Sequence, residues 1–196
     1  MNMRKQTNMK GLAVGLAASV VLMAAAGRVG AHPGLQDGGV AAAFSHPFIG
    51  LDHLLAMLAV GAWAACGGGR LAPLGFLAGA LAGAAVGTLG QALPALEAGL
   101  ALSVLCCGLA LAVARAWPAT VALLVCAVFG TWHGNAHGLE IPGLLAAAPL
   151  AAFAAGTALL HAAGYIAALA VRRSAPELLR GTGWALALCG GLLALA

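Results

Sequence analysis

The sequence predicts an all-α integral membrane protein: a six-helix transmembrane bundle after a cleavable signal peptide. Of its 196 residues, 63% are hydrophobic and only 7% are charged, whereas soluble domains carry about 25% charged residues. Apolar runs near spanning length recur along the chain, and the basic residues fall in alternate connections between them. Because so few charges cannot cover a surface that faces water, the composition excludes a soluble enzyme, a nucleic-acid-binding module and a disordered tail.

Residues 1–31 have the features of a secretory signal peptide. The first ten residues carry three basic side chains, residues 12–26 are apolar, and residues 29–31 are small. Cleavage after residue 31 leaves a six-span transmembrane domain over residues 32–196 that begins outside the cytoplasm. The alternative is an uncleaved first membrane helix, which the shortness of the apolar run disfavours.

Six spans of about 20 residues are expected in this domain. We place them near residues 47–65, 71–90, 95–114, 118–138, 143–171 and 181–196. Most connections are only a few residues long, so sequential helices are expected to be antiparallel neighbours. The only sizeable polar loop is predicted over residues 172–180.

The basic residues orient this layout. If the mature N-terminus is outside, the connections after the first, third and fifth spans face the cytoplasm. These connections contain every arginine of residues 32–196: Arg70, Arg115, Arg172, Arg173 and Arg180. The opposite connections contain none, as the positive-inside rule requires. The net charge of +4 therefore reports topology in a lipid bilayer, and no nucleic-acid partner is expected.

Glycine recurs every fourth residue in the second and fourth spans. The two stripes are Gly75, Gly79, Gly83 and Gly87, and Gly130, Gly134 and Gly138. Such stripes let another helix approach closely, either within the chain or in a homo-oligomer, and the sequence does not separate these two. The five cysteines show no C-x-x-C spacing, so we interpret them as small apolar residues.

Ionisable side chains within apolar spans are costly and therefore indicate function. The candidates are His46, Asp52 and His53 near the first span, Glu97 in the third, and His133, His137 and Glu140 in the fourth. Helical spacing places His46 and His53 on one face and stacks the three residues of the fourth span along one stripe. All seven are therefore expected to converge at one membrane depth, on the outer side.

Imidazoles and carboxylates together predict a site for a divalent cation. These ligands suit Ni²⁺, Co²⁺ or Zn²⁺, whereas Mg²⁺ and Ca²⁺ prefer shells of oxygen. The carboxylates offset the charge of the ion and lower the cost of holding it near lipid. In the absence of metal, some of these groups are expected to be protonated or paired with one another. The competing interpretation is a purely structural polar network.

Two further polar residues lie within the spans. His161 is alone in the fifth span; we interpret it as a hydrogen-bonding partner of a neighbouring helix, with a relay toward the cytoplasm as the alternative. Asn135 is expected to orient one of the ligands.

The two motifs resemble the signature of the HupE/UreJ family. They read His46-Pro-Phe-Ile-Gly-Leu-Asp52-His53 and Phe129-Gly-Thr-Trp-His133-Gly-Asn-Ala-His137-Gly-Leu-Glu140, and the resemblance covers the whole mature chain. It implies a small protein of the bacterial inner membrane that takes up nickel or cobalt, with a periplasmic mature N-terminus. It also implies that His46, Asp52, His53, His137 and Glu140 are functional; we extend this to His133 by motif and to Glu97 as an isolated acid.

The expected activity is transport, with Ni²⁺ or Co²⁺ as the transported substrate and no tightly bound cofactor. The chain contains no G-x-x-x-x-G-K-[ST] motif, so it is not expected to hydrolyse nucleotide itself. One alternative is an intramembrane zinc-dependent hydrolase, which needs three protein ligands and an activated water. Against it, the sequence shows no further convergent serine or base. The other alternative is a metal sensor or chaperone partner, for which six packed spans are more than is needed.

Overall fold

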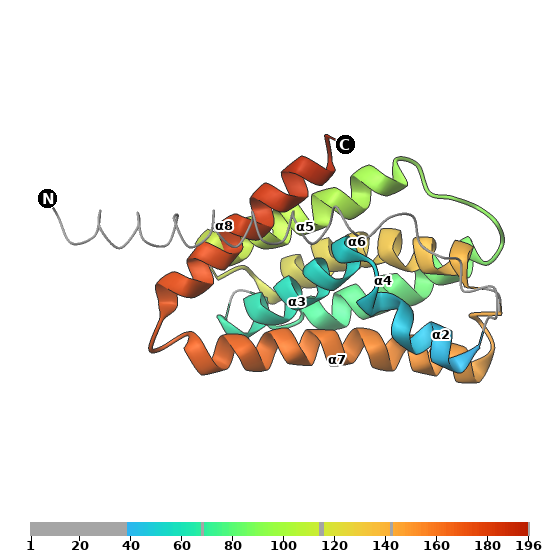
Figure 1. Ribbon diagram of the computed structural model, residues 1–196, viewed down its shortest axis with the longest axis horizontal. Coiled ribbons are helices and arrows are strands. Elements are labelled where there is room, and N and C mark those ends of the chain that lie inside the picture. Colours follow the sequence, from blue (N-terminus) through green and yellow to red (C-terminus); the bar gives the residue numbers. More distant parts are fainter. Residues whose placement is uncertain (1–38, 68, 114–115, 142, 196) are drawn as a thin grey trace, which may run out of the picture.

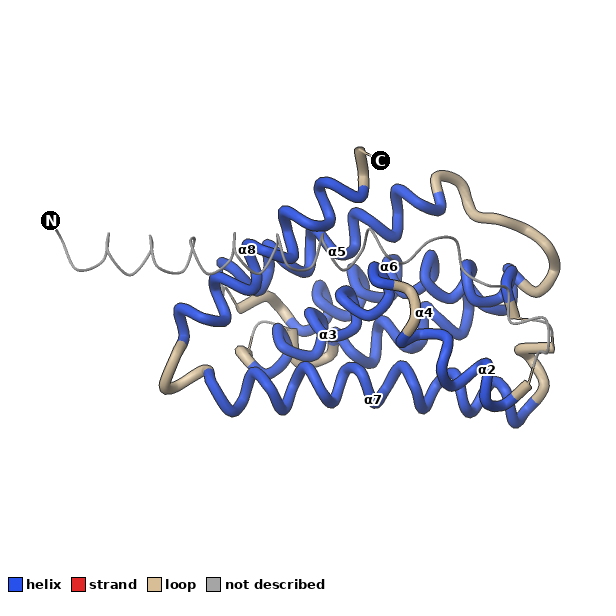
Figure 2. Tube along the Cα trace, viewed as in Figure 1, coloured by secondary structure: helices blue, strands red, loops and turns tan. Residues whose placement is uncertain are grey.

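The computed structural model describes residues 39–67, 69–113, 116–141 and 143–195. Their helices are α2 (Val40–Ser45), the 3₁₀ turn η1 (His46–Phe48), α3 (Leu51–Ala65), α4 (Ala72–Gly87), α5 (Leu96–Val113), α6 (Ala119–Glu140), α7 (Ala147–Val171) and α8 (Pro176–Leu193). No strand occurs in these ranges, so the all-α class is confirmed (Figures 1 and 2). The predicted signal peptide and its cleavage site lie outside the described residues.

Three of the described helices, α5, α6 and α7, are long and apolar enough to cross a membrane. The number rises to four if α2, η1 and α3 are counted as one broken span. Helix α4 is apolar but has only 16 residues. The structure therefore supports a multi-pass membrane protein, whereas six complete spans stay a prediction.

The first span is not the continuous helix predicted over residues 47–65. The segment that ends with η1 meets α3 at an angle of 76°. Gly50 lies at the break with an extended backbone, at φ −71° and ψ 121°, and Pro47 occupies the first turn of η1, where its fixed φ is favourable. The break places His46 in a separate turn ahead of the helix that carries Asp52 and His53.

The last helix also differs from its predicted bounds. Helix α8 begins at Pro176, so the second half of the expected polar loop at 172–180 is helical. Proline is favoured in the first turn of a helix because its missing N–H would lack a partner there anyway. Glu177 and Arg180 lie one turn apart on this helix, 3.9 Å from each other.

The closest helix pairs are not sequential in the chain. Helix α4 packs against α6, α3 against α7, and α5 against α8, so the expectation that sequential helices are nearest neighbours is wrong. Glycine explains the pairing, because a Cβ at Gly79 would overlap the Ala127 carbonyl and one at Gly134 would overlap the Ala80 carbonyl. The close packing predicted from the stripes is thus confirmed within one chain, and neither stripe is free for a second copy.

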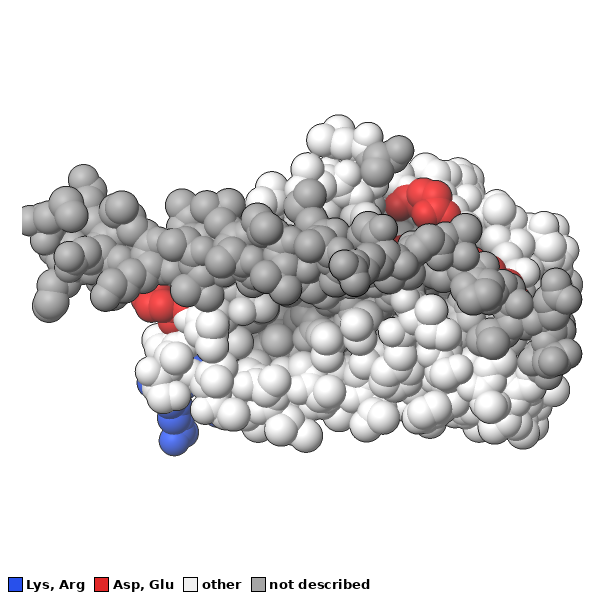
Figure 3. All heavy atoms as spheres, in the orientation of Figure 1, with Lys and Arg blue, Asp and Glu red and all other residues white. Residues whose placement is uncertain are grey.

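One end of the bundle carries the basic residues. Arg172, at the end of α7, donates a hydrogen bond of 2.6 Å from a guanidinium nitrogen to the carbonyl of Ala65, at the end of α3. The ends of these two helices therefore lie together. Figure 3 shows arginine or lysine only at the left-hand end of the visible face, where α7 joins α8 in Figure 1. We call this the α7–α8 end; the polar motifs of α3 and α6 lie toward the opposite one.

Replacing Gly79 by alanine is expected to destabilise the protein, because the added methyl group meets helix backbone that cannot move aside. Overpacking of this kind costs about 1–3 kcal/mol. Gly191→Ala in α8 is the matched control, since nothing lies within 4 Å of the added carbon. Thermal unfolding in detergent should show a lower midpoint for Gly79→Ala only. Equal midpoints for the two variants would contradict the proposed role of the stripe.

Candidate metal site

Two carboxylates pair with imidazoles at the start of α3 and the end of α6. His46 Nε2 lies 2.6 Å from Glu140 Oε2, which joins η1 to the last turn of α6. Asp52 Oδ1 accepts a 2.8 Å hydrogen bond from the backbone N–H of His53 and lies 2.7 Å from His53 Nδ1. Such pairs orient imidazoles and select their tautomer. Neutral His53 therefore carries its proton on Nδ1 and leaves the lone pair on Nε2.

A serine on α5 orients the ring of His133. Ser103 Oγ donates a 2.6 Å hydrogen bond to the Leu100 carbonyl and lies 2.7 Å from His133 Nε2. Because its single hydrogen is engaged by the carbonyl, the hydroxyl oxygen accepts from His133 Nε2–H. The lone pair of His133 is then on Nδ1.

The two lone-pair nitrogens lie in the protein interior. Neither His53 Nε2 nor His133 Nδ1 has a hydrogen-bond partner among the described residues. The ring centroids of the two histidines are 4.6 Å apart, and the His137 ring lies 4.4 Å from that of His53. Buried polar atoms normally find partners, so two buried imidazole nitrogens without one, on adjacent rings, are what a ligand site would offer.

Six of the seven residues predicted for the site form one contiguous group. The rings of His46 and His137 are 5.0 Å apart, which connects the His46–Glu140 pair to the histidines of α3 and α6. We call these six residues the polar cluster: His46, Asp52, His53, His133, His137 and Glu140. That the cluster holds a metal ion stays a prediction.

Glu97 is the residue that the structure does not join directly to the others. It lies in the first turn of α5, is exposed, and within the described ranges has no hydrogen bond or ion pair with the polar cluster. Glu97 therefore does not belong to the cluster, and its part in a metal site stays a prediction.

Burial separates the oxygens of the cluster from its nitrogens. The four histidines are between 0 and 9% exposed, whereas the side chains of Glu140 and Asp52 are 43% and 22% exposed. The two carboxylates of the cluster therefore lie nearer the surface of the described structure than its imidazoles.

The polar cluster is not arranged as a ready-made coordination shell. In the described part of the chain, no three His, Cys, Asp or Glu side chains have the geometry to hold a metal ion together. Asp52 and Glu140 are instead engaged with imidazoles, in agreement with the expectation that such groups pair with one another when no metal is bound. Binding an ion would require these pairs to exchange partners.

Asn135 has a different role from the one expected. Its Oδ1 accepts a 2.9 Å hydrogen bond from the N–H of Leu93, and its Nδ2 donates a 2.8 Å hydrogen bond to the carbonyl of Gln91. Both partners lie in the connection between α4 and α5. Asn135 therefore fixes this connection to α6 and orients no ligand.

Two residues of the site were missed by the sequence argument. Ser103 and Phe76 both contact His133, and the Phe76 ring centroid lies 5.1 Å from that of His133. The statement that no further serine converges on the site was thus wrong. Ser103 is fully buried and its oxygen is engaged twice, so it orients an imidazole and is not placed as a nucleophile.

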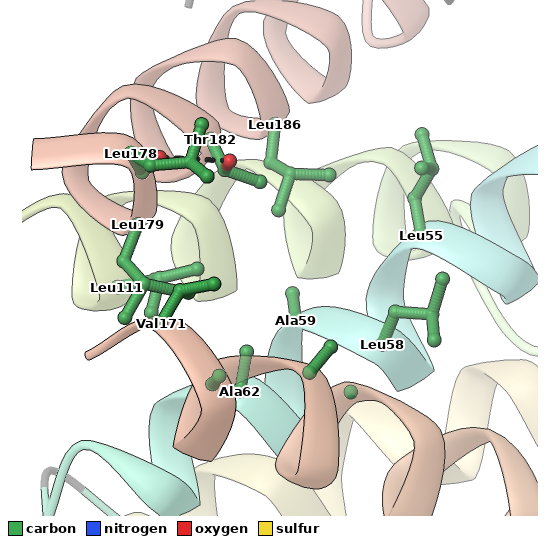
Figure 4. A pocket seen from close by; sticks show the side chains of 13 residues that line it. Leu55, Leu58, Ala59, Ala62, Leu111, Val171, Leu178, Leu179, Thr182 and Leu186 are labelled. Atoms are coloured by element: carbon green, nitrogen blue, oxygen red, sulfur yellow. Dashed lines mark hydrogen bonds between the residues drawn. The ribbon is translucent and has the colours of Figure 1, made fainter. Parts of the chain in front are cut away.

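An apolar pocket lies elsewhere in the bundle. Its volume is about 340 Å³, and its lining from α3, α5, α7 and α8 is aliphatic except for Thr182 (Figure 4). The hydroxyl of Thr182 is engaged by the Leu178 carbonyl at 2.9 Å. This pocket offers no ligand for a cation, in contrast to the polar cluster.

Comparison with known proteins identifies relatives over most of the chain. Residues 12–193 match the family described as "HupE / UreJ protein". The protein HupE of Rhizobium leguminosarum bv. viciae is 39% identical over 168 residues, which covers 83% of this chain and 88% of that protein. No solved structure matches the chain.

Removing the Ser103 hydroxyl is expected to change the tautomer of His133, because the acceptor that holds the proton on Nε2 is lost. Nitrogen-15 NMR of histidine-labelled protein, assigned with a His133→Gln variant, should show the Nε2–H form in the unmodified protein and a mixture in Ser103→Ala. Thr182→Ala, which removes a hydroxyl bonded to its own helix, is the control. An Nδ1–H form in the unmodified protein would refute the assignment.

Proposed function

The chain belongs to the HupE/UreJ family, and from this premise we propose that it takes up a divalent transition-metal ion, nickel or cobalt, across the bacterial inner membrane. The route begins at the polar cluster on the periplasmic side. The observation that carries the proposal is the pair of bare, buried nitrogens on His53 and His133, next to carboxylates that are partly exposed.

The arrangement suits stepwise loss of water from an arriving cation. Glu97, Asp52 and Glu140 are exposed or partly exposed acids, and they would supply an attractive field at the entrance. The ion then competes with His53 and His46 for the carboxylates that these rings hold. When a carboxylate leaves its imidazole to coordinate the ion, that imidazole can coordinate the ion next. Oxygen and then nitrogen ligands thus replace the water around the ion.

The balance of ligands favours a borderline transition metal over the abundant hard cations. Four imidazoles lie within the cluster, and they are more deeply buried than its two carboxylates. Mg²⁺ dehydrates reluctantly and prefers oxygen, whereas Ni²⁺ and Co²⁺ accept imidazole readily. Since the carboxylates also compensate charge, the ion can enter a region that would otherwise be too costly for it.

The proposed orientation rests on the arginines. Arg172, Arg173 and Arg180 lie at the α7–α8 end, opposite the polar cluster, and basic residues accumulate on the cytoplasmic side of membrane proteins. The cluster then faces the periplasm, and an inside-negative membrane potential favours inward movement of a dication.

The hydrolase alternative receives no support. A zinc hydrolase needs an open coordination position with a reactive water, and within the described ranges the additional polar side chain at His133 is Ser103, whose hydroxyl is already engaged. The function that fits the buried nitrogens is the passage of an ion.

Asp52→Asn and His53→Ala are each expected to lower initial nickel uptake about tenfold or more, since orienting partners and ligands of metals are typically worth 10–100-fold. Accumulation is measured in cells that lack their own nickel uptake, with membrane abundance of each variant checked by immunoblot. Glu177→Gln, at the start of α8 away from the cluster, is the control and should transport normally. Normal uptake by Asp52→Asn at equal abundance would contradict the assignment.

Selectivity provides a second test, in proteoliposomes that contain the unmodified protein. Uptake of Ni²⁺ is expected to be inhibited by Co²⁺ at a comparable concentration but not by about a hundredfold excess of Mg²⁺, because the buried ligands are imidazoles. Repeating the assay with and without a proton gradient identifies the driving force. Equal inhibition by Mg²⁺ would mean that oxygen ligands govern the site.

A further inference from the structure

Buried polar atoms continue inward from the polar cluster along α7. Thr157 Oγ1 and His161 Nε2 have no hydrogen-bond partner among the described residues, and their residues are 0% and 5% exposed. Four residues apart, they lie on the same face of the helix. The hydrogen bond expected from His161 to a neighbouring helix is therefore not made by this nitrogen. Burying two polar atoms without hydrogen bonds on one helix face destabilises the fold unless a ligand binds to them.

Phe76 connects this face of α7 to the polar cluster. Its ring is fully buried, and its centroid lies 5.1 Å from that of His133 and 5.2 Å from that of His161. The two histidines come from α6 and α7, so one aromatic ring of α4 is the common neighbour of both. The Phe76 ring is thus in contact with both imidazoles.

A groove extends from His161 toward the α7–α8 end. Its volume is about 350 Å³, and it lies between α7, where Tyr165 also lines it, and the first half of α4, beginning at Pro73. Pro73 is in the first turn of α4, close to the connection that follows α3. His161 thus borders the buried interior at Phe76 and this groove, whose lining reaches the first turn of α4.

We propose that His161 is an inner binding station for the transported cation, separated from the polar cluster by the ring of Phe76. This inference rests on the proposed function. The ion leaves the cluster when the Phe76 ring moves aside, coordinates Nε2 of His161 with Thr157 Oγ1 nearby, and departs along the groove.

The difference in ligands between the polar cluster and His161 favours release of the cation inward. The polar cluster combines imidazoles with carboxylates, whereas the described surroundings of His161 in the groove are aliphatic apart from Tyr165. A single neutral imidazole binds a dication more weakly than several imidazoles with charged oxygens. Passage through a membrane requires sites that bind well enough for entry and weakly enough for exit, and an outer strong site followed by an inner weak one meets that requirement.

The test compares nickel binding with nickel uptake in four proteins: unmodified, His161→Leu, His161→Cys and Tyr165→Phe. Equilibrium binding of radioactive Ni²⁺ to purified protein reports the outer cluster, and initial uptake in proteoliposomes reports passage. His161→Leu is expected to bind within about twofold of the unmodified protein but to transport about tenfold more slowly. His161→Cys should recover part of the rate because sulfur also coordinates nickel, and Tyr165→Phe, in the same groove, should change neither quantity.

The possible failures are distinguishable. Full transport by His161→Leu would overturn the inner station and leave the proposed function standing. Loss of both binding and uptake in His161→Leu and His161→Cys alike would assign His161 to folding and would also overturn it. Absence of uptake by the unmodified protein would refute the proposed function, and the inner station with it.

Discussion

Direct contact between helix backbones at glycine holds α4 against α6 and α3 against α7. In lipid, helices gain little from burying apolar side chains against each other, so close backbone approach becomes a main source of specific pairing. Gly79 and Gly134 place α4 and α6 in contact, in a register that puts Phe76 beside His133. Contacts at Gly61 and Gly164 likewise place the backbones of α3 and α7 against each other. Because these contacts involve main-chain atoms, the two helices of each pair cannot slide past each other. The side chains at their interfaces therefore have little room to move.

The histidines of the interior are costly in such a bundle, and their hydrogen bonds compensate only part of the cost. Asp52 satisfies one nitrogen of His53 and Ser103 one nitrogen of His133, and in each ring the other nitrogen stays without a partner in the described structure. A purely structural polar network would be expected to satisfy both nitrogens. The incomplete satisfaction supports the proposed passage of an ion over a network that only holds helices together.

The sequence predicted the all-α class and the grouping of the polar cluster, because helical period and alternating orientation together bring His53, His133 and His137 to one region. It did not predict the break at Gly50, since an isolated glycine before a helical run has no periodic signal. It also failed for the helix neighbours, because short connections suggest sequential contact whereas the glycine contacts select partners two or more helices away. Ser103 and Phe76 were missed because a hydroxyl and an aromatic ring in an apolar helix look like ordinary packing residues until their neighbours are known.

X-ray absorption spectroscopy of the nickel-loaded protein tests the central claim most directly, because it reports which atoms surround the ion. The account predicts a shell of nitrogen and oxygen with the outer-shell scattering of at least two imidazoles, and loss of imidazole scattering in His53→Ala. A shell dominated by sulfur, or one of oxygen alone that is unchanged in His53→Ala, would contradict the assignment of the bare nitrogens as metal ligands.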